Sequence, residues 1–211
     1  MRIAVDLDGV VVDSVPYWIA VVNREAGTAY GPGDLPQGYA TPEMAAICDA
    51  HEVEMLVAPH PVPGARAACA RLRADGHRLI AVTARAPRMR RLTEAWLDYH
   101  GIALDDLLFL QGAPKLPVIQ AERLALLIED TPAHALSVAA AGIPVLLFST
   151  PYNRAVQHPG ICRCEGWHGV LGAVPAWSAG PAAAASGGRE LSPAGRERGA
   201  GNGGGAGRAG A

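Results

Sequence analysis

The sequence lacks a large excess of either acidic or basic residues. Asp, Glu, Lys and Arg make up 18% of its 211 residues, and the formal net charge at pH 7 is -2. Such a balance gives no general electrostatic attraction to nucleic acid or to an anionic membrane surface. A nucleic acid polymer and a lipid surface are therefore excluded as main partners.

Long apolar runs are also lacking. The longest, around residues 135–148, is short and is interrupted by Gly142 and Pro144, so it is not expected to span a bilayer. At the N-terminus, Asp6 and Asp8 stand where a secretory signal peptide needs an uninterrupted apolar core. We therefore expect no membrane association and a cytoplasmic location.

Cysteine is scarce as well. The four cysteines are Cys48, Cys69, Cys162 and Cys164. They are too few and too unevenly spaced for a disulfide framework, so reduced thiols are expected. Cys162 and Cys164 lie between His158 and His168, which suggests zinc as an alternative. The Cys-x-Cys spacing lacks the two-residue gap of typical zinc motifs, and an edge strand with apolar thiols is favoured.

The N-terminus is the most informative part of the sequence. An apolar strand ends in Asp6 and Asp8, and Gly9 follows directly. Side chains alternate along a strand, so the two carboxylates share a face while Leu7 turns away. Gly9 allows the backbone to turn sharply after them. A nucleophile and an acid/base could thus come from one strand end, although Asp-x-Asp also occurs in surface turns and in sugar-nucleotide metal sites.

Apolar strand-like runs and helical patterns alternate along the chain, half of which is apolar. The expected strands span residues 3–6, 77–83, 107–110, 126–129 and 144–148. The expected helices between them span residues 63–76, 88–100 and 132–141, each ending at or just before a glycine. Continuous apolar strands that alternate with helices indicate a parallel sheet covered on both faces. The predicted fold is α/β, with a doubly wound, five-stranded parallel sheet.

Two segments depart from this alternation. Residues 14–62 hold a helix with an apolar stripe (Val15, Trp18, Ile19 and Val22), then a Gly/Pro-rich stretch and a second helical run. They predict a helical cap over the carboxyl ends of the strands, inserted into a core of residues 1–13 and 63–171. Residues 172–211 are rich in Gly, Ala and Arg and predict a disordered tail.

Polar residues stand at the ends of later strands. Thr83 closes the second strand, Lys115 follows the third, and Glu129 and Asp130 close the fourth. Each has an ordinary explanation as a helix cap or a solvated charge. Because parallel strands deliver their carboxyl ends to one edge, the same residues are also expected to gather near the N-terminal aspartates.

In their order along the chain, Asp6-Leu7-Asp8-Gly9-Val10, Thr83, Lys115 and Glu129-Asp130 resemble the four motifs of the haloacid dehalogenase-like phosphohydrolase superfamily. The resemblance extends from residue 1 to about residue 171. Further strings resemble one branch, the cytosolic deoxyribonucleotidases and their bacterial relatives. These strings are Asp8-Gly9-Val10 with Asp13, Val82-Thr83-Ala84-Arg85, Ile128-Glu129-Asp130, Gly142-Ile143-Pro144-Val145 and Pro151-Tyr152-Asn153-Arg154.

The resemblance implies a two-step phosphoryl transfer. Asp6 would attack phosphorus and form an aspartyl phosphate, while Asp8 would protonate the leaving oxygen and later take a proton from water. Two carboxylates beside a phosphate repel one another, so a hard divalent cation is needed. Mg²⁺ fits, held by Asp6, the backbone carbonyl of Asp8, and Asp130. Thr83, Ala84 and Lys115 would bind the phosphate oxygens.

Asp8 also separates this interpretation from related ones. Dehalogenases of the superfamily lack the second aspartate because they expel halide, and P-type ATPases carry Thr there and have membrane helices. Response-regulator receivers place their acidic pair before the Thr, whereas Glu129 and Asp130 follow Lys115 here.

The expected substrate is a small phosphate ester, most simply a (deoxy)nucleoside monophosphate. The branch usually carries an aromatic residue, which can stack on a base, just after the aspartate matched by Asp13, and this chain has Ser14 there. Tyr17 and Trp18 could supply a stacking surface instead, although Trp18 belongs to the apolar stripe and is expected in the core.

Arginines cluster after Thr83, near a helix N-terminus that disfavours positive charge. We therefore hypothesise that Arg85 or Arg88 contacts the substrate or the cap. A sugar phosphate or another small metabolite is the alternative substrate. A non-catalytic metabolite-binding or regulatory protein that retains this fold is the alternative from a different functional class.

Overall fold

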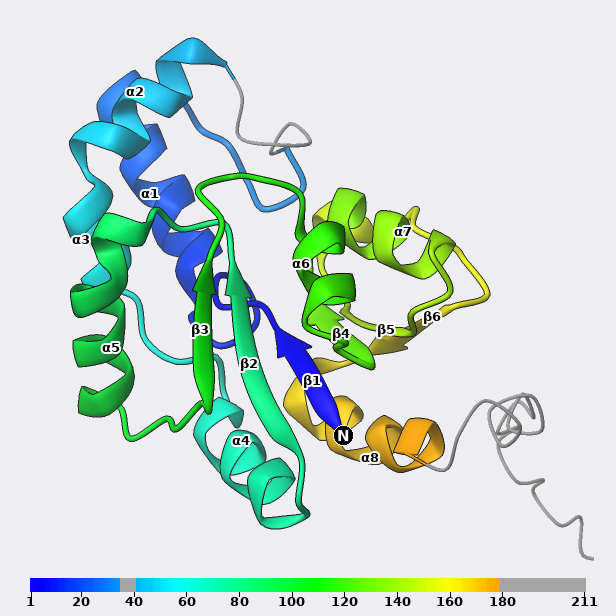
Figure 1. Cartoon of the computed structure of the whole chain (residues 1–211). Coiled ribbons are helices and arrows are strands. Elements are labelled where there is room, and N and C mark those ends of the chain that lie inside the picture. Colours follow the sequence, from blue (N-terminus) through cyan, green and yellow to red (C-terminus); the bar gives the residue numbers. More distant parts are fainter. Residues whose placement is uncertain (35–40, 179–211) are drawn as a thin grey trace, which may run out of the picture.

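The computed structural model describes residues 1–34 and 41–178 (Figure 1). Its strands are β1 (Arg2–Val5), β2 (Arg78–Thr83), β3 (Asp106–Phe109), β4 (Leu126–Glu129), β5 (Val145–Phe148) and β6 (Ile161–Cys164). All pair in parallel in the order β3-β2-β1-β4-β5-β6, so the chain starts in the middle of the sheet and winds to both edges. The predicted doubly wound α/β fold is confirmed.

The predicted number of strands was wrong, because the sheet has six strands and not five. The added strand, β6, pairs with β5 from Val145↔Ile161 to Phe148↔Cys164 and forms one edge. It carries Cys162 and Cys164, and the edge strand favoured for this segment is present, with both cysteines as free thiols. With an exposed Arg163 between the two cysteines, β6 lacks the continuous apolar run that marks the other strands.

Helices cover both faces of the sheet. One face packs against α4 (Ala65–Ala74), α5 (Arg90–Tyr99) and α8 (Gly166–Ser178), and the other against α6 (Lys115–Ala121) and α7 (Pro132–Ala140). Along β1, Ile3 and Val5 belong to the core under the first group, while Ala4 belongs to the core under the second. Short 3-10 helices follow β2 (η1, Pro87–Met89) and β5 (η2, Pro151–Asn153).

Three helices lie between β1 and β2, namely α1 (Ser14–Ala26), α2 (Pro42–Ala50) and α3 (Glu52–Val57). We call them the helical insertion. They contact one another, and α3 also contacts α5 (Figure 1). Val15, Ile19 and Val22 of the predicted stripe are buried, whereas Trp18 is only half-buried. Within the described ranges, no helix is long and apolar enough to cross a lipid bilayer.

The predicted start of the tail at residue 172 was wrong, because α8 continues to Ser178. Val170 and Val174, one turn apart, are buried in the core beneath α4 and α8, and this burial stabilises the helix despite Gly172 and Pro175. The remainder of the predicted tail, residues 179–211, lies outside the described residues.

Candidate active site

The loop after β1 runs directly past the end of β4. The backbone N–H of Asp6 donates to the carbonyl of Ile128 at 2.9 Å, so Asp6 extends the pairing of β1 with β4 at the carboxyl edge of the sheet. Gly9 follows with a φ of +80°, and a Cβ at this position would lie 1.9 Å from Oδ2 of Asp130. Only glycine therefore allows this close approach of the two loops.

The chain leaves this edge for the helical insertion and returns beside itself. Val12 forms an antiparallel bridge with Pro61, and the N–H of Asp13 donates to the carbonyl of His60 at 2.8 Å. His60 thus lies where the chain returns from the helical insertion, and its backbone carbonyl connects the outgoing and returning segments.

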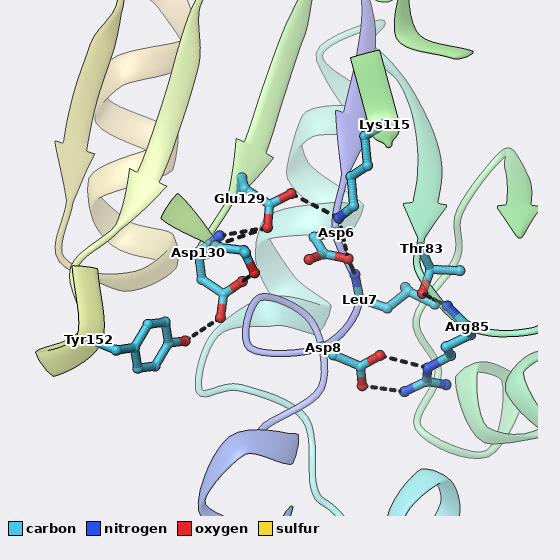
Figure 2. Close-up of polar contacts among 10 residues, drawn as sticks. Asp6, Leu7, Asp8, Thr83, Arg85, Lys115, Glu129, Asp130 and Tyr152 are labelled. Carbon is cyan, nitrogen blue, oxygen red and sulfur yellow. Dashed lines mark hydrogen bonds and ion pairs between the residues drawn. The ribbon is translucent and has the colours of Figure 1, made fainter. Parts of the chain in front are cut away.

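Lys115 is fully buried and links two carboxylates. Its Nζ lies 2.8 Å from Oδ1 of Asp6 and 2.8 Å from Oε2 of Glu129 (Figure 2). Although burial alone would lower the pKa of Lys115, the two carboxylates raise it above its usual value. Burial alone would raise the pKa of Glu129, but the Lys115 ammonium lowers it to about 2. Lys115 and Glu129 are therefore both charged at neutral pH.

One buried cation does not balance the carboxylates gathered here. Burial, followed by the charge of Glu129, raises the pKa of Asp6 well above its usual value and that of Asp130 to about 7. A nucleophilic carboxylate must be ionised, so the site needs a second positive charge.

The carboxylates are placed to hold that charge. Asp6, Glu129 and Asp130 each offer an oxygen within 4.8 Å of the others, and all three residues are buried. Carboxylate oxygens suit Mg²⁺, and Gly9 keeps the space beside Asp130 clear of a side chain. Of the three, Asp6 and Asp130 are the residues that the sequence motifs indicate as direct ligands, whereas Glu129 was given no such role. The residues present fit a divalent cation.

Asp8 is held apart from this cluster by Arg85. The guanidinium donates to both carboxylate oxygens, at 2.9 Å from Nε and 2.7 Å from Nη2 (Figure 2). It also donates to Oγ1 of Thr93 at 3.1 Å. The Arg85 side chain is only 7% exposed. This forked pair fixes the orientation of Asp8.

Thr83 and Ala84 connect the strand end to this ion pair. Thr83 is fully buried at the end of β2, and its Oγ1 accepts a hydrogen bond from the N–H of Arg85 at 3.2 Å. The carbonyl of Ala84 accepts from Gly112 at 2.9 Å, which ties the loop after β2 to the loop after β3.

A cleft of about 510 Å³ opens over Asp8, between the helical insertion and the loop after β2. Its lining residues come from α1 to α3 on one side and, on the other, from residues 84–86, from Arg88 and Met89, and from Gln111. An ion pair of 2.8 Å between Glu52 and Arg88 joins the two sides. The cleft is thus bounded by charged and apolar side chains beside the catalytic candidates.

Two aromatic residues of α1 have different places. Trp18 lines the cleft, and its indole N–H donates to the carbonyl of Met55 at 3.3 Å. Tyr17 instead donates to Glu54 at 2.7 Å, and among the described residues it is not part of the cleft lining. Of the two residues named as stacking candidates, Trp18 thus lies at the cleft, although the core was the favoured place for it, and Tyr17 lies outside the cleft lining.

The strand-end residues named from the sequence do meet at one edge of the sheet, but several contacts were not foreseen. Of the two arginines expected to contact the substrate or the cap, Arg88 pairs with Glu52 of the cap segment, whereas Arg85 pairs with Asp8. Glu129 accepts from Lys115. Tyr152 donates a hydrogen bond to Oδ2 of Asp130 (Figure 2). In the sequence, Tyr152 was named only within the string Pro151-Tyr152-Asn153-Arg154, with no role in the site.

Comparison with known proteins identifies the family. The family described as 5′ nucleotidase, deoxy (Pyrimidine), cytosolic type C protein matches residues 1–175. The chain belongs to this family. The resemblance to the nucleotidase branch of the haloacid dehalogenase-like phosphohydrolases, seen in the motifs, is thereby confirmed.

Two curated relatives of this 5′-nucleotidase family member align with different shares of the chain. A nucleotidase of Clostridium acetobutylicum is 27% identical over 181 residues, which cover 82% of this chain and 93% of the relative. YqfW of Bacillus subtilis, named as a candidate nucleotidase, is 33% identical over 94 residues, or 44% of this chain. The chain spans about half the length of this second relative, 49%.

Solved structures show the same fold at low identity. A hydrolase of the haloacid dehalogenase-like family from Streptococcus pneumoniae has a TM-score of 0.62 at 17% identity, covering 82% of this chain and 97% of that one. A D,D-heptose 1,7-bisphosphate phosphatase from B. bronchiseptica, solved with magnesium and phosphate, has a TM-score of 0.52 at 13% identity, with coverage of 82% and 97%.

Proposed function

We propose that the protein is a Mg²⁺-dependent phosphomonoesterase that works through an aspartyl phosphate. The observation that carries this proposal is the grouping at one sheet edge of a lysine-bound Asp6, a second carboxylate at Asp130 and a separately held Asp8. Family membership and the magnesium found in the heptose-bisphosphate phosphatase are consistent with it.

In the first step, a carboxylate oxygen of Asp6 forms a bond to phosphorus as the bond from phosphorus to the leaving oxygen breaks. Asp8 first takes up a proton from solvent, which frees one of its oxygens from Arg85. It then gives that proton to the leaving oxygen, and in the second step it takes a proton from the water that attacks phosphorus and releases Asp6. Lys115 and Thr83, with the backbone of Ala84, bind phosphate oxygens and stabilise the charge that develops on them.

A bound Mg²⁺ would supply charge neutralisation between the phosphate and the carboxylates, with Asp6, Asp130 and the backbone carbonyl of Asp8 as ligands. Lys115 keeps Asp6 in place and binds Glu129 at the same time. Arg85 fixes Asp8 on the cleft side of the loop, where the leaving group would sit.

The substrate we propose is a nucleoside 5′-monophosphate, in a cytoplasmic location. The family description and the half-buried Trp18 in the cleft, which can stack on a base, support it. Residues 14–62 would act as the cap over a core of residues 1–13 and 63–171, with the extension of α8 to Ser178 added. A panel of nucleotides and sugar phosphates, assayed for phosphate release with Mg²⁺, distinguishes a nucleotidase from a phosphatase for another small metabolite.

The decisive test of the mechanism is Asp6→Asn, which keeps the shape of the side chain and removes the nucleophile. Phosphate release should fall to background. Asp75→Asn is the matched control, because Asp75 is an exposed carboxylate paired with Arg71 far from the cleft, and it should leave the rate unchanged. Full activity in Asp6→Asn would overturn the mechanism, and no release from any ester by the wild type would favour a non-catalytic binding protein.

A further inference from the structure

The cleft contains one charged residue that the rest of the site does not neutralise. Its lining includes two ion pairs, Asp8 with Arg85 at 2.7 Å and Glu52 with Arg88 at 2.8 Å. Asp49 also lines the cleft, and within residues 1–34 and 41–178 its carboxylate forms no hydrogen bond or ion pair. The unneutralised charge in the cleft lining therefore comes from Asp49, whose side chain is exposed to solvent.

The position of Asp49 along its helix makes its unpaired negative charge energetically unfavourable. Asp49 is the penultimate residue of α2, and the last turn of α2 has no basic residue. A negative charge near a helix C-terminus is disfavoured by the helix dipole. A ligand that donates hydrogen bonds to Asp49 would offset this cost, whereas an acceptor or a second anionic group would increase it.

An ionised carboxylate only accepts hydrogen bonds, so it distinguishes leaving groups by their donors. Cytosine, adenine and guanine carry exocyclic amino groups, and a carboxylate is a preferred partner of the cytosine amino group. Uracil and thymine present carbonyl oxygens at the equivalent position. We propose, resting on the nucleotidase function above, that Asp49 selects nucleoside monophosphates whose base bears an amino group over those of uracil and thymine.

The matched substrates for the test are dCMP and dUMP, which differ only at one edge of the base. The wild type should show a kcat/KM for dCMP about tenfold above that for dUMP, and Asp49→Ala should bring the ratio close to one. Glu43→Ala, at an exposed acid on the same helix that is outside the cleft lining, should keep the wild-type ratio.

An unchanged ratio in Asp49→Ala, or a wild-type preference for dUMP, would overturn the selectivity of Asp49 while leaving the nucleotidase function intact. Absence of phosphate release from both nucleotides, with release from sugar phosphates, would overturn the nucleotide substrate itself. The two failures are therefore distinguishable in one set of assays.

Independently of Asp49, two residues of η2 form hydrogen bonds with Asp130. The Tyr152 hydroxyl donates to Oδ2 of Asp130 (Figure 2). Thr131 Oγ1 donates to Oδ1 of Asp130 at 3.2 Å. The amide of Asn153, fully buried, donates to the carbonyl of Asp130 at 2.8 Å and to that of Phe148 at 2.7 Å. Both the backbone and the carboxylate of Asp130 are thus oriented by neighbours.

We infer that Tyr152 is a positioning residue that holds the Asp130 carboxylate ready for the metal of the proposed site. Hydrogen bonds that orient a metal ligand commonly contribute 10- to 100-fold in metal affinity. Tyr152→Phe removes one hydroxyl and keeps the ring, so it should weaken Mg²⁺ binding by a factor in this range. Isothermal titration of the resting protein with MgCl₂ measures this without any substrate.

Tyr99→Phe is the control, because Tyr99 is 86% exposed on α5, and it should bind Mg²⁺ as the wild type does. The rate of Tyr152→Phe at saturating Mg²⁺ should return close to the wild-type value. Unchanged Mg²⁺ affinity in Tyr152→Phe, or no Mg²⁺ binding by the wild type, would overturn the positioning role, whatever ester the protein hydrolyses.

Discussion

Gly9→Ala tests whether the close approach of the β1 loop to Asp130 is essential to the site. Two glycines allow the comparison, since Gly9 and Gly142 both have a φ of +80°. A Cβ at Gly9 would lie 1.9 Å from Oδ2 of Asp130, whereas a Cβ at Gly142 would meet no described atom within 4 Å. The backbone strain of a left-handed alanine, about 1–2 kcal/mol, is common to both variants.

The overlap at Gly9 adds a second cost. The Asp130 carboxylate must move away from the new methyl group, and it then loses contacts with Tyr152 and Thr131. A hydrogen bond to a charged group contributes about 1.5–3 kcal/mol. We expect Gly9→Ala to lower the free energy of unfolding by about 3–5 kcal/mol, compared with about 1–2 kcal/mol for Gly142→Ala.

Urea denaturation of both variants measures these losses, and calorimetric titration with MgCl₂ measures the displacement of Asp130. Gly9→Ala should also lose Mg²⁺ binding, whereas Gly142→Ala should retain it. If Gly9→Ala were as stable as Gly142→Ala and bound Mg²⁺ like the wild type, the close contact would have no role and the reasoning would fail.

Three further outcomes are expected. Without divalent cation, the free energy of unfolding should fall as the pH rises from about 4 towards 7. Burial and the charge of Glu129 raise the pKa of Asp130 to about 7. In this pH range the folded protein therefore keeps a proton on Asp130 that the unfolded chain has lost. Urea titrations across this range with and without Mg²⁺ check it, and a rise in stability would contradict it. Lys115→Met leaves the carboxylates of Asp6 and Glu129 buried without their cation, so denaturation should show a loss of about 3–5 kcal/mol at pH 8. Burial raises the pKa of Cys69 to about 12, so mass spectrometry should find this thiol unlabelled by iodoacetamide in the folded protein at pH 8, and rapid labelling would show that its helix opens.

The parts of the site that could be predicted are those fixed by strand direction. Asp6, Thr83 and Asp130 each stand at the end of an apolar run, and parallel strands bring their carboxyl ends to one edge. The order of residue types along the chain was therefore sufficient to place them together. The same regularity predicted five of the strands in the sheet.

The contacts between side chains could not be predicted in this way. The pairing of Arg85 with Asp8 depends on side-chain rotamers and on the path of the loop after β2, and neither leaves a periodic pattern. Trp18 lies on the helical face expected to be buried, but the packing of α1 against its neighbours leaves it at the cleft. For β6 and the end of α8, the apolar signal was diluted by Arg163, Gly172 and Pro175, although tertiary packing still stabilises both elements.

The central position of β1 has a consequence for how the protein is made. β1 precedes the other strands of the sheet in the chain, but Ile3 pairs with Leu79 on one side and with Leu126 on the other. One edge of this apolar strand therefore stays unpaired until β2 has left the ribosome and the other until β4 has, and unpaired strand edges promote aggregation. Pairing over long sequence separations also slows folding. Production of the protein should accordingly be sensitive to chaperone supply and growth temperature, and a nascent chain released before β4 would lack both the completed sheet and Asp130.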